Sequence, residues 1–138
     1  MLVNIDEIQR KVDKMILRAG FPKCSVNLCS APAGDGTPYI SFENNTYNYV
    51  YSERGYEFSR KVTNSLDTLL YWIMSELAYK VAFRYELENR IKGRDGRRIA
   101  FPKFIEIMAN INPAWEQEAR YEIQKVLAEA PYDDSLYT

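Results

Sequence analysis

The chain has 138 residues and a formal net charge of -1, and apolar residues make up 46% of it. This length and composition fit a single folded domain, residues 1–138, that buries its own core without disulfides or metals. The near-neutral charge gives no indication of nucleic acid or membrane as the main partner, and the lack of any histidine excludes His-dependent triads, His general bases and His-bearing zinc sites.

Segment 4–19 is predicted to be an amphipathic helix. Asn4 is a suitable N-cap, with Glu7 three residues later as in a capping box. Gly20 and Pro22 end the helix. Its apolar residues recur at steps of three and four: Ile5, Ile8, Val12, Met15, Ile16 and Ala19.

Segment 24–28 alternates apolar and polar residues, which favours a strand. Its spacing makes a disulfide between Cys24 and Cys29 geometrically poor, so we expect two reduced thiols. Reduced thiols fit a cytoplasmic location. The N-terminus has no basic segment followed by an apolar core, so we expect no signal peptide.

Three further strands are predicted at 39–43, 46–51 and 55–62. Asn44-Asn45 fits a tight hairpin between the first two, because Asn tolerates positive φ. The connection before them contains Gly34-Asp35-Gly36, which lacks the spacing of a phosphate loop and is interpreted as a flexible connection. We therefore expect an antiparallel meander of three or four strands.

The period changes from two to 3.6 after residue 65. A long helix is predicted over 66–92, with an apolar stripe that runs from Leu66 to Leu87 and Ile91. A shorter helix follows over 101–111, and Asn112-Pro113 starts a last one. The tail from Pro131 to Thr138 is polar, and we expect it to be partly loose. The fold class is therefore α+β, with an N-terminal helix, a meander sheet, and three helices of which the long central one packs on the sheet.

Three polar groups are candidates for function. Glu53-Arg54-Gly55 lies between two predicted strands and is either a hairpin turn or a polar site on the sheet rim. Asp133-Asp134 lies in an acidic region after Trp115, but no third ligand has suitable spacing, so no metal site is assigned. A basic run, which either contacts an acidic partner or is solvated, comprises Arg90, Lys92, Arg94, Arg97, Arg98 and Lys103.

Several short motifs resemble bacterial immunity proteins of polymorphic toxin systems, in the family numbered sixty-three. Tyr47 followed after five residues by Glu53-Arg54-Gly55 is the first of them. The others, in chain order, are Asp67-Thr68-Leu69-Leu70-Tyr71-Trp72, Tyr85-Glu86-Leu87-Glu88-Asn89-Arg90, Asp95-Gly96-Arg97-Arg98 with Phe101, and Pro131-Tyr132-Asp133-Asp134. The resemblance covers roughly residues 39–134.

The resemblance implies a small cytoplasmic protein that binds and neutralises a cognate protein toxin, with no catalysis. We assign no cofactor, and we expect no membrane partner because no apolar run approaches the length of a membrane span. It makes Tyr47, Glu53, Arg54, Gly55, Arg97, Arg98, Asp133 and Asp134 the candidate motif or partner-binding residues. Two alternatives stay open: a nucleic-acid-associated or phage-type accessory protein that uses the basic loop at 90–103, and a carboxylate-dependent hydrolase that uses Glu53.

Overall fold

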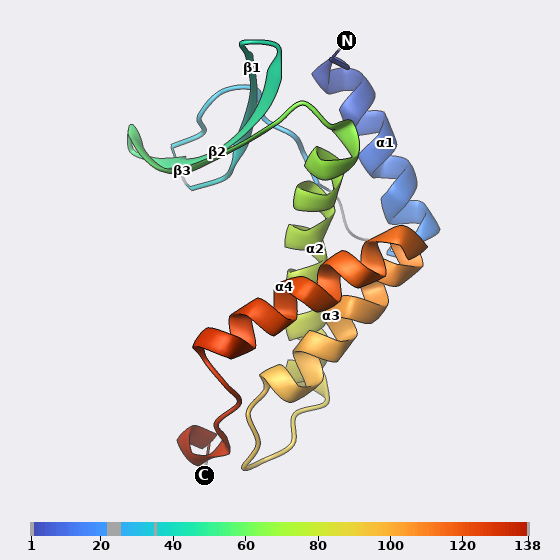
Figure 1. The fold of residues 1–138 in the computed structure, drawn as a ribbon, viewed down its shortest axis with the longest axis vertical. Helices are drawn as coiled ribbons and strands as arrows, with labels where there is room; N and C mark the ends of the chain where they lie inside the picture. Colours follow the sequence, from blue (N-terminus) through green and yellow to red (C-terminus); the bar gives the residue numbers. More distant parts are fainter. Residues whose placement is uncertain (1, 22–25, 35, 138) are drawn as a thin grey trace. The chain divides into compact units, whose positions relative to one another are not determined.

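The computed structural model describes residues 2–21, 26–34 and 36–137, whose helices and strands are shown in Figure 1. Cys24 and Asp35, which entered the predictions above, lie outside the described residues. The chain divides into two compact units, Met1–Ile73 and Met74–Thr138, and the division falls inside helix α2 (Leu66–Glu88). Among the described residues we find no helix with the length and apolar character that a membrane crossing requires.

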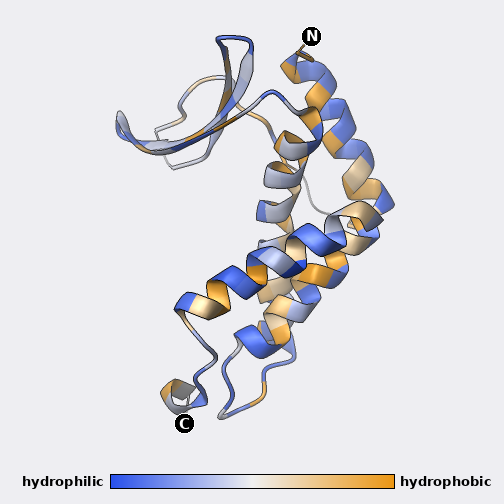
Figure 2. Cartoon of the chain, viewed as in Figure 1, coloured by the Kyte–Doolittle hydropathy of each residue, from blue (hydrophilic) through white to orange (hydrophobic). Residues whose placement is uncertain are grey.

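Helix α1 (Ile5–Arg18) is the amphipathic helix that its sequence predicts. Asn4 is its N-cap, because the Asn4 side-chain oxygen accepts a hydrogen bond from the Glu7 backbone N–H at 2.9 Å. The face that carries Ile8, Val12 and Ile16 is buried, and hydrophobic and hydrophilic residues alternate along the helix in Figure 2. The three- and four-residue spacing of the apolar side chains therefore sets which side of α1 enters the core.

The sheet has three antiparallel strands in the order β1 (Tyr39–Glu43), β2 (Thr46–Glu53) and β3 (Tyr56–Thr63), which confirms the predicted meander. Both hairpins turn over two residues with positive φ. These are Asn44 and Asn45 at 53° and 58°, and Arg54 and Gly55 at 51° and 82°. Positive φ at both positions is the geometry of a type I′ turn, whose twist matches that of the flanking strands.

Phe58 is the extra residue of a β-bulge in β3, because its two neighbours pair with consecutive residues of β2. The bulge puts Glu57 and Arg60 on the same side of the strand, where they form an ion pair at 2.9 Å. Arg60 also reaches Glu43 of β1 and the side-chain oxygen of Asn48 in β2, each at 3.1 Å. One guanidinium thus links all three strands on this face of the sheet.

The beginning of α2 packs on the sheet through Trp72. Its indole stacks on the buried ring of Tyr49 with 6.4 Å between centroids, and the Lys61 ammonium lies 5.6 Å from the indole centroid. Leu69 and Ile73 are buried on the same stretch of helix. The first turns of α2, up to Ile73 in the N-terminal unit, therefore pack on the sheet.

The strand predicted at 24–28 is wrong over its described part, because residues 26–28 form no ladder. The side-chain amide of Gln9 satisfies their backbone instead, as it donates to the Val26 carbonyl at 2.6 Å and accepts from the Leu28 N–H at 2.9 Å. Cys29, whose thiol is free, makes a single parallel bridge to the start of β1. A side chain of α1 thus takes the role that a neighbouring strand was expected to fill.

The C-terminal unit contains the rest of α2 with α3 (Arg97–Ile111), the short helix η1 (Pro113–Trp115), α4 (Glu116–Glu129) and η2 (Asp134–Tyr137). The rings of Tyr79 and Phe104 stack with 3.9 Å between centroids, and the Tyr79 hydroxyl donates a hydrogen bond to Glu122 of α4. The Asn112 side chain accepts from the Ala114 N–H at 3.0 Å, so the predicted N-cap is confirmed and begins η1 ahead of α4.

Two predicted boundaries are wrong in this unit. Helix α2 ends at Glu88 and not near residue 92, and α3 begins at Arg97 and not at residue 101. The earlier start follows from Asp95, whose carboxylate accepts the Arg97 backbone N–H at 3.0 Å. Leu87 and Ile91 were predicted to belong to the buried apolar stripe, but their side chains are 63% and 56% exposed.

Candidate functional site

The first candidate motif lies on the β2–β3 hairpin, and its members are separated along β2. Tyr47 is buried, and its hydroxyl accepts a hydrogen bond from the Val3 backbone N–H at 2.8 Å, which fixes the chain ahead of α1. Glu53 and Arg54 are exposed at the other end of the strand, about 20 Å away at the usual rise per residue. Gly55 completes the type I′ turn. Tyr47 and Gly55 therefore have structural roles, and Glu53 and Arg54 stand at an exposed hairpin tip.

The second group of candidate residues surrounds Asp95, which begins the turn into α3. The Asp95 carboxylate is 1% exposed and forms an ion pair with Arg97 at 2.7 Å. The Arg97 Nε lies 3.2 Å from one carboxylate oxygen and 3.1 Å from the other. Such a fork of charge-assisted hydrogen bonds fixes the orientation of the guanidinium.

Arg97 uses this fixed orientation to hold residues 130–134, which we name the C-terminal strap. Its Nη1 donates to the Ala130 carbonyl and its Nη2 to the Pro131 carbonyl, both at 2.8 Å. The Asp133 N–H donates to Asp95 at 3.1 Å. The expectation of a loose tail is therefore wrong for this segment, because its backbone groups are satisfied by charged side chains of the α2–α3 turn.

Asp134, the last residue of the strap, binds the α2–α3 turn through its own carboxylate. Its carboxylate accepts the Asp95 backbone N–H at 2.7 Å and pairs with Arg98 at 2.9 Å and Arg94 at 3.2 Å. The Arg98 guanidinium also lies 4.7 Å from the centroid of the Tyr132 ring. Of the candidate residues named from the sequence, Arg97, Arg98, Asp133 and Asp134 are thus brought together by the fold.

Charge pairing controls the ionisation of the two acids that hold the strap. The Arg97 guanidinium, hydrogen-bonded to both oxygens of Asp95, holds the pKa of that carboxyl well below its usual range. The hydrogen bond from Arg98 lowers the pKa of Asp134 to about 2. A general acid or base works best with a pKa near the operating pH. Both carboxyls instead stay ionised at neutral pH, which suits acceptors that hold backbone and guanidinium groups in place.

Glu86 and Gly96 also belong to this group, although neither was among the candidate residues. A Cβ on Gly96 would lie 2.2 Å from a carboxylate oxygen of Glu86, so no larger residue fits there while Glu86 keeps its position. Glu86 is buried and pairs with Arg90 at 3.0 Å. Only the four-residue spacing of Glu86 and Arg90 signals this pair in the sequence, and nothing local signals the contact with Gly96.

Most cations of the basic run are already paired within the C-terminal unit. Five ion pairs account for them: Arg90–Glu86, Arg94–Asp134, Arg97–Asp95, Arg98–Asp134 and Lys103–Glu106. This pairing reduces the positive charge that the run offers to a phosphate backbone at long range. Three of the four acids in these pairs lie outside residues 90–103, namely Glu86, Glu106 and Asp134, so the run by itself does not reveal the pairing.

Two further carboxylates of the C-terminal unit are likewise engaged. Glu116 pairs with Arg120 at 3.1 Å, and Glu122 accepts from the Tyr79 hydroxyl. Over residues 2–21, 26–34 and 36–137, no three Cys, Asp or Glu side chains are grouped so that they could hold a metal ion.

Comparison with protein families identifies one match. The family model described as immunity protein 63 matches residues 43–125. The matched range contains the β2–β3 hairpin and the Asp95 turn and ends before the C-terminal strap. No curated protein and no solved structure matches the chain.

Proposed function

The chain belongs to the immunity protein 63 family, and on this basis we propose that it binds a cognate bacterial toxin and neutralises it by protein–protein contact, without catalysing a reaction. The observation that carries the proposal is the family match over residues 43–125, more than half of the chain. The toxin belongs to a polymorphic toxin system, and the bacterial cytoplasm is where the two proteins meet.

The electrostatics of the Asp95 group support a binding role. Asp95 and Asp134 have lowered pKa values and accept hydrogen bonds from guanidinium and backbone donors. A carboxylate that acts as a general acid at neutral pH needs its pKa raised. The arrangement favours a rigid scaffold whose outer surface makes the contacts.

A growth assay tests the proposal directly. The toxin domain encoded beside this chain's gene is placed under an inducible promoter in a bacterial host, with and without the full chain. We expect the chain to restore growth and to co-purify with the toxin domain as a complex that survives size-exclusion chromatography. Lack of both rescue and complex with every neighbouring toxin candidate would refute the proposal.

The matched control is a destabilised chain, Asp95→Asn, tested at a temperature at which it is unfolded. Rescue should then be lost together with the fold. Rescue by an unfolded chain would show that protection does not come from a folded binding surface.

A further inference from the structure

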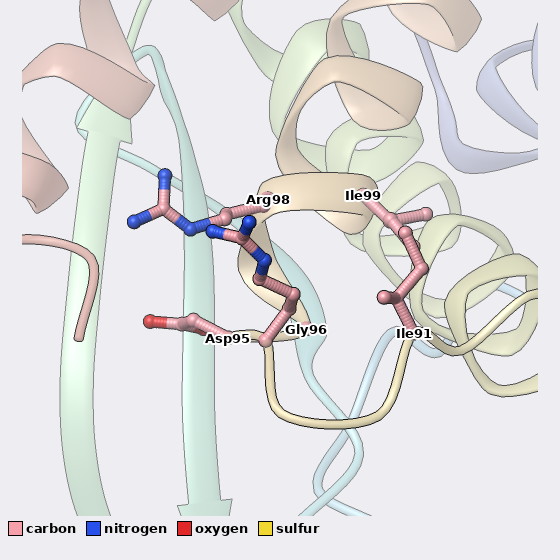
Figure 3. Close-up of a pocket in the computed structure, with 6 residues that line it drawn as sticks. Ile91, Asp95, Gly96, Arg98 and Ile99 are labelled. Carbon is pink, nitrogen blue, oxygen red and sulfur yellow. The ribbon is translucent and has the colours of Figure 1, made fainter. Parts of the chain in front are cut away.

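A pocket of about 280 Å³ lies at the turn between α2 and α3. Six residues line it: Ile91, Arg94, Asp95, Gly96, Arg98 and Ile99. In Figure 3 the side chains of Ile91 and Ile99 lie next to each other on one side, whereas Arg98 and Asp95 extend to the other. The pocket therefore has an apolar wall and a charged wall.

Charge around the pocket is layered, with acids inside and arginines outside. Three ion pairs form the layers: Arg90–Glu86, Arg94–Asp134 and Arg98–Asp134. The acidic side chains are 3% and 27% exposed, and the arginine side chains are 57%, 60% and 41% exposed. A partner that approaches this surface meets guanidinium groups first, although the acids beneath them keep the net charge low.

The two arginines that line the pocket retain hydrogen-bonding capacity. Arg94 donates to Asp134 through Nη1, and Arg98 through Nε. A guanidinium carries five N–H donors, and its planar fork matches a carboxylate. Beside them, Ile91 is a 56% exposed apolar side chain, and covering its surface with a partner would stabilise a complex.

We propose that this pocket is a docking site for an acidic segment of the cognate toxin, an inference that rests on the proposed function. An apolar side chain of the toxin packs between Ile91 and Ile99, and a carboxylate next to it binds Arg94 and Arg98. This arrangement covers apolar surface and matches the outward charge at the same time, which is how interfaces gain both affinity and register.

A nucleic acid fits the same pocket less well. Phosphates would use the two arginines, but the apolar wall would lack a partner. Bases bind single-strand sites by stacking on aromatic rings, and the six residues that line the pocket include no aromatic side chain.

Substitutions at Ile91 test the site with little risk to the fold, because the side chain is already exposed. The full chain is titrated into the catalytically inactivated toxin domain by isothermal calorimetry. Ile91→Asp places a negative charge on the apolar wall and should weaken binding by about 10- to 100-fold, the range of an interface hot spot. Ile91→Lys removes the same apolar surface but introduces a positive charge. It should therefore weaken binding less than Ile91→Asp does.

Val62→Asp is the matched control, because Val62 is an apolar side chain of similar exposure, 53%, in β3 of the N-terminal unit. It should leave the affinity unchanged. Arg94→Gln gives an independent measure: it should weaken binding and reduce its dependence on salt. Urea unfolding of each variant checks that the fold is intact.

The outcomes separate this inference from the proposed function. If the unchanged chain does not bind the toxin domain, the proposed function fails and the docking site fails with it. If the unchanged chain binds and Ile91→Asp and Arg94→Gln bind equally well, only the docking site is refuted. If an oligonucleotide binds the chain at this pocket and Ile91→Asp has no effect on toxin affinity, the pocket is assigned to nucleic acid. That outcome would likewise refute the docking site.

Discussion

Asp95→Asn is the substitution that most directly tests the Asp95 group. The carboxylate is 1% exposed and accepts hydrogen bonds from the Arg97 backbone, the Arg97 guanidinium and the Asp133 backbone. Whichever way the new amide is oriented, its NH₂ faces N–H donors, and the guanidinium loses its counter-charge. Loss of one partner from a buried ion pair costs about 3–5 kcal/mol. That is a large share of the roughly 5–15 kcal/mol that stabilises a typical domain.

Urea unfolding at pH 7, followed by circular dichroism at 222 nm, measures the effect. Asp133→Asn is the matched control, because it removes the same charge in the strap and its amide oxygen can still accept from the Ser135 N–H. The control should change the free energy of unfolding by less than about 0.5 kcal/mol, as is usual for surface sites. A change for Asp95→Asn as small as the control's would refute the role assigned to this carboxylate.

Three further predictions follow from the same geometry. Because the pKa of Asp134 is about 2 in the folded chain and about 3.9 in an unfolded one, its stabilisation is complete above the unfolded value and is lost as pH falls toward the folded one. Stability should therefore decline below about pH 4, and Asp134→Asn should flatten that decline; equal slopes would contradict the assignment. Gly96→Ala should destabilise the chain by about 1–3 kcal/mol, since its Cβ meets a buried oxygen of Glu86. The same change in a Glu86→Ala background should cost clearly less, and equal costs in a double-mutant cycle would show that the two residues do not interact. Arg54→Asn should stabilise the chain by about 0.5–1 kcal/mol in thermal unfolding, because Asn tolerates a φ of 51° better than Arg does, and a loss of stability would mean that Arg54 makes a favourable contact.

The parts of the fold that the sequence predicts correctly depend on neighbouring residues. Asn4 and Asn112 cap helices with their own side chains, and Asn44-Asn45 makes a hairpin with its own backbone angles. Each of these devices acts within three or four residues. A single sequence is sufficient to reveal them, because the donor, the acceptor and the turn all lie in one short segment.

The incorrect predictions concern features that are determined by residues far apart in the sequence. The strap is held by Arg97, which lies more than thirty residues away along the chain. No periodic sequence pattern predicts such a contact. Leu87 and Ile91 continue the apolar spacing of α2 but are exposed, because spacing shows which side of a helix is apolar and not how far along it the core extends. Arg97, Arg98, Asp133 and Asp134 gather around Asp95 and Gly96, which were not named as site residues, whereas the motif residues of the β2–β3 hairpin lie elsewhere.

Because acids lie beneath arginines at this surface, different residues stabilise the fold and face a partner. The inner carboxylates, Glu86 and Asp95, hold the turn and the strap in place. The outer arginines are exposed, and so are their neighbours Ile91 and Lys92. Substitutions there can alter recognition while the turn keeps its shape. Under the proposed function, one scaffold can therefore be adapted to different toxins, and a designer could retarget it by changing exposed positions alone.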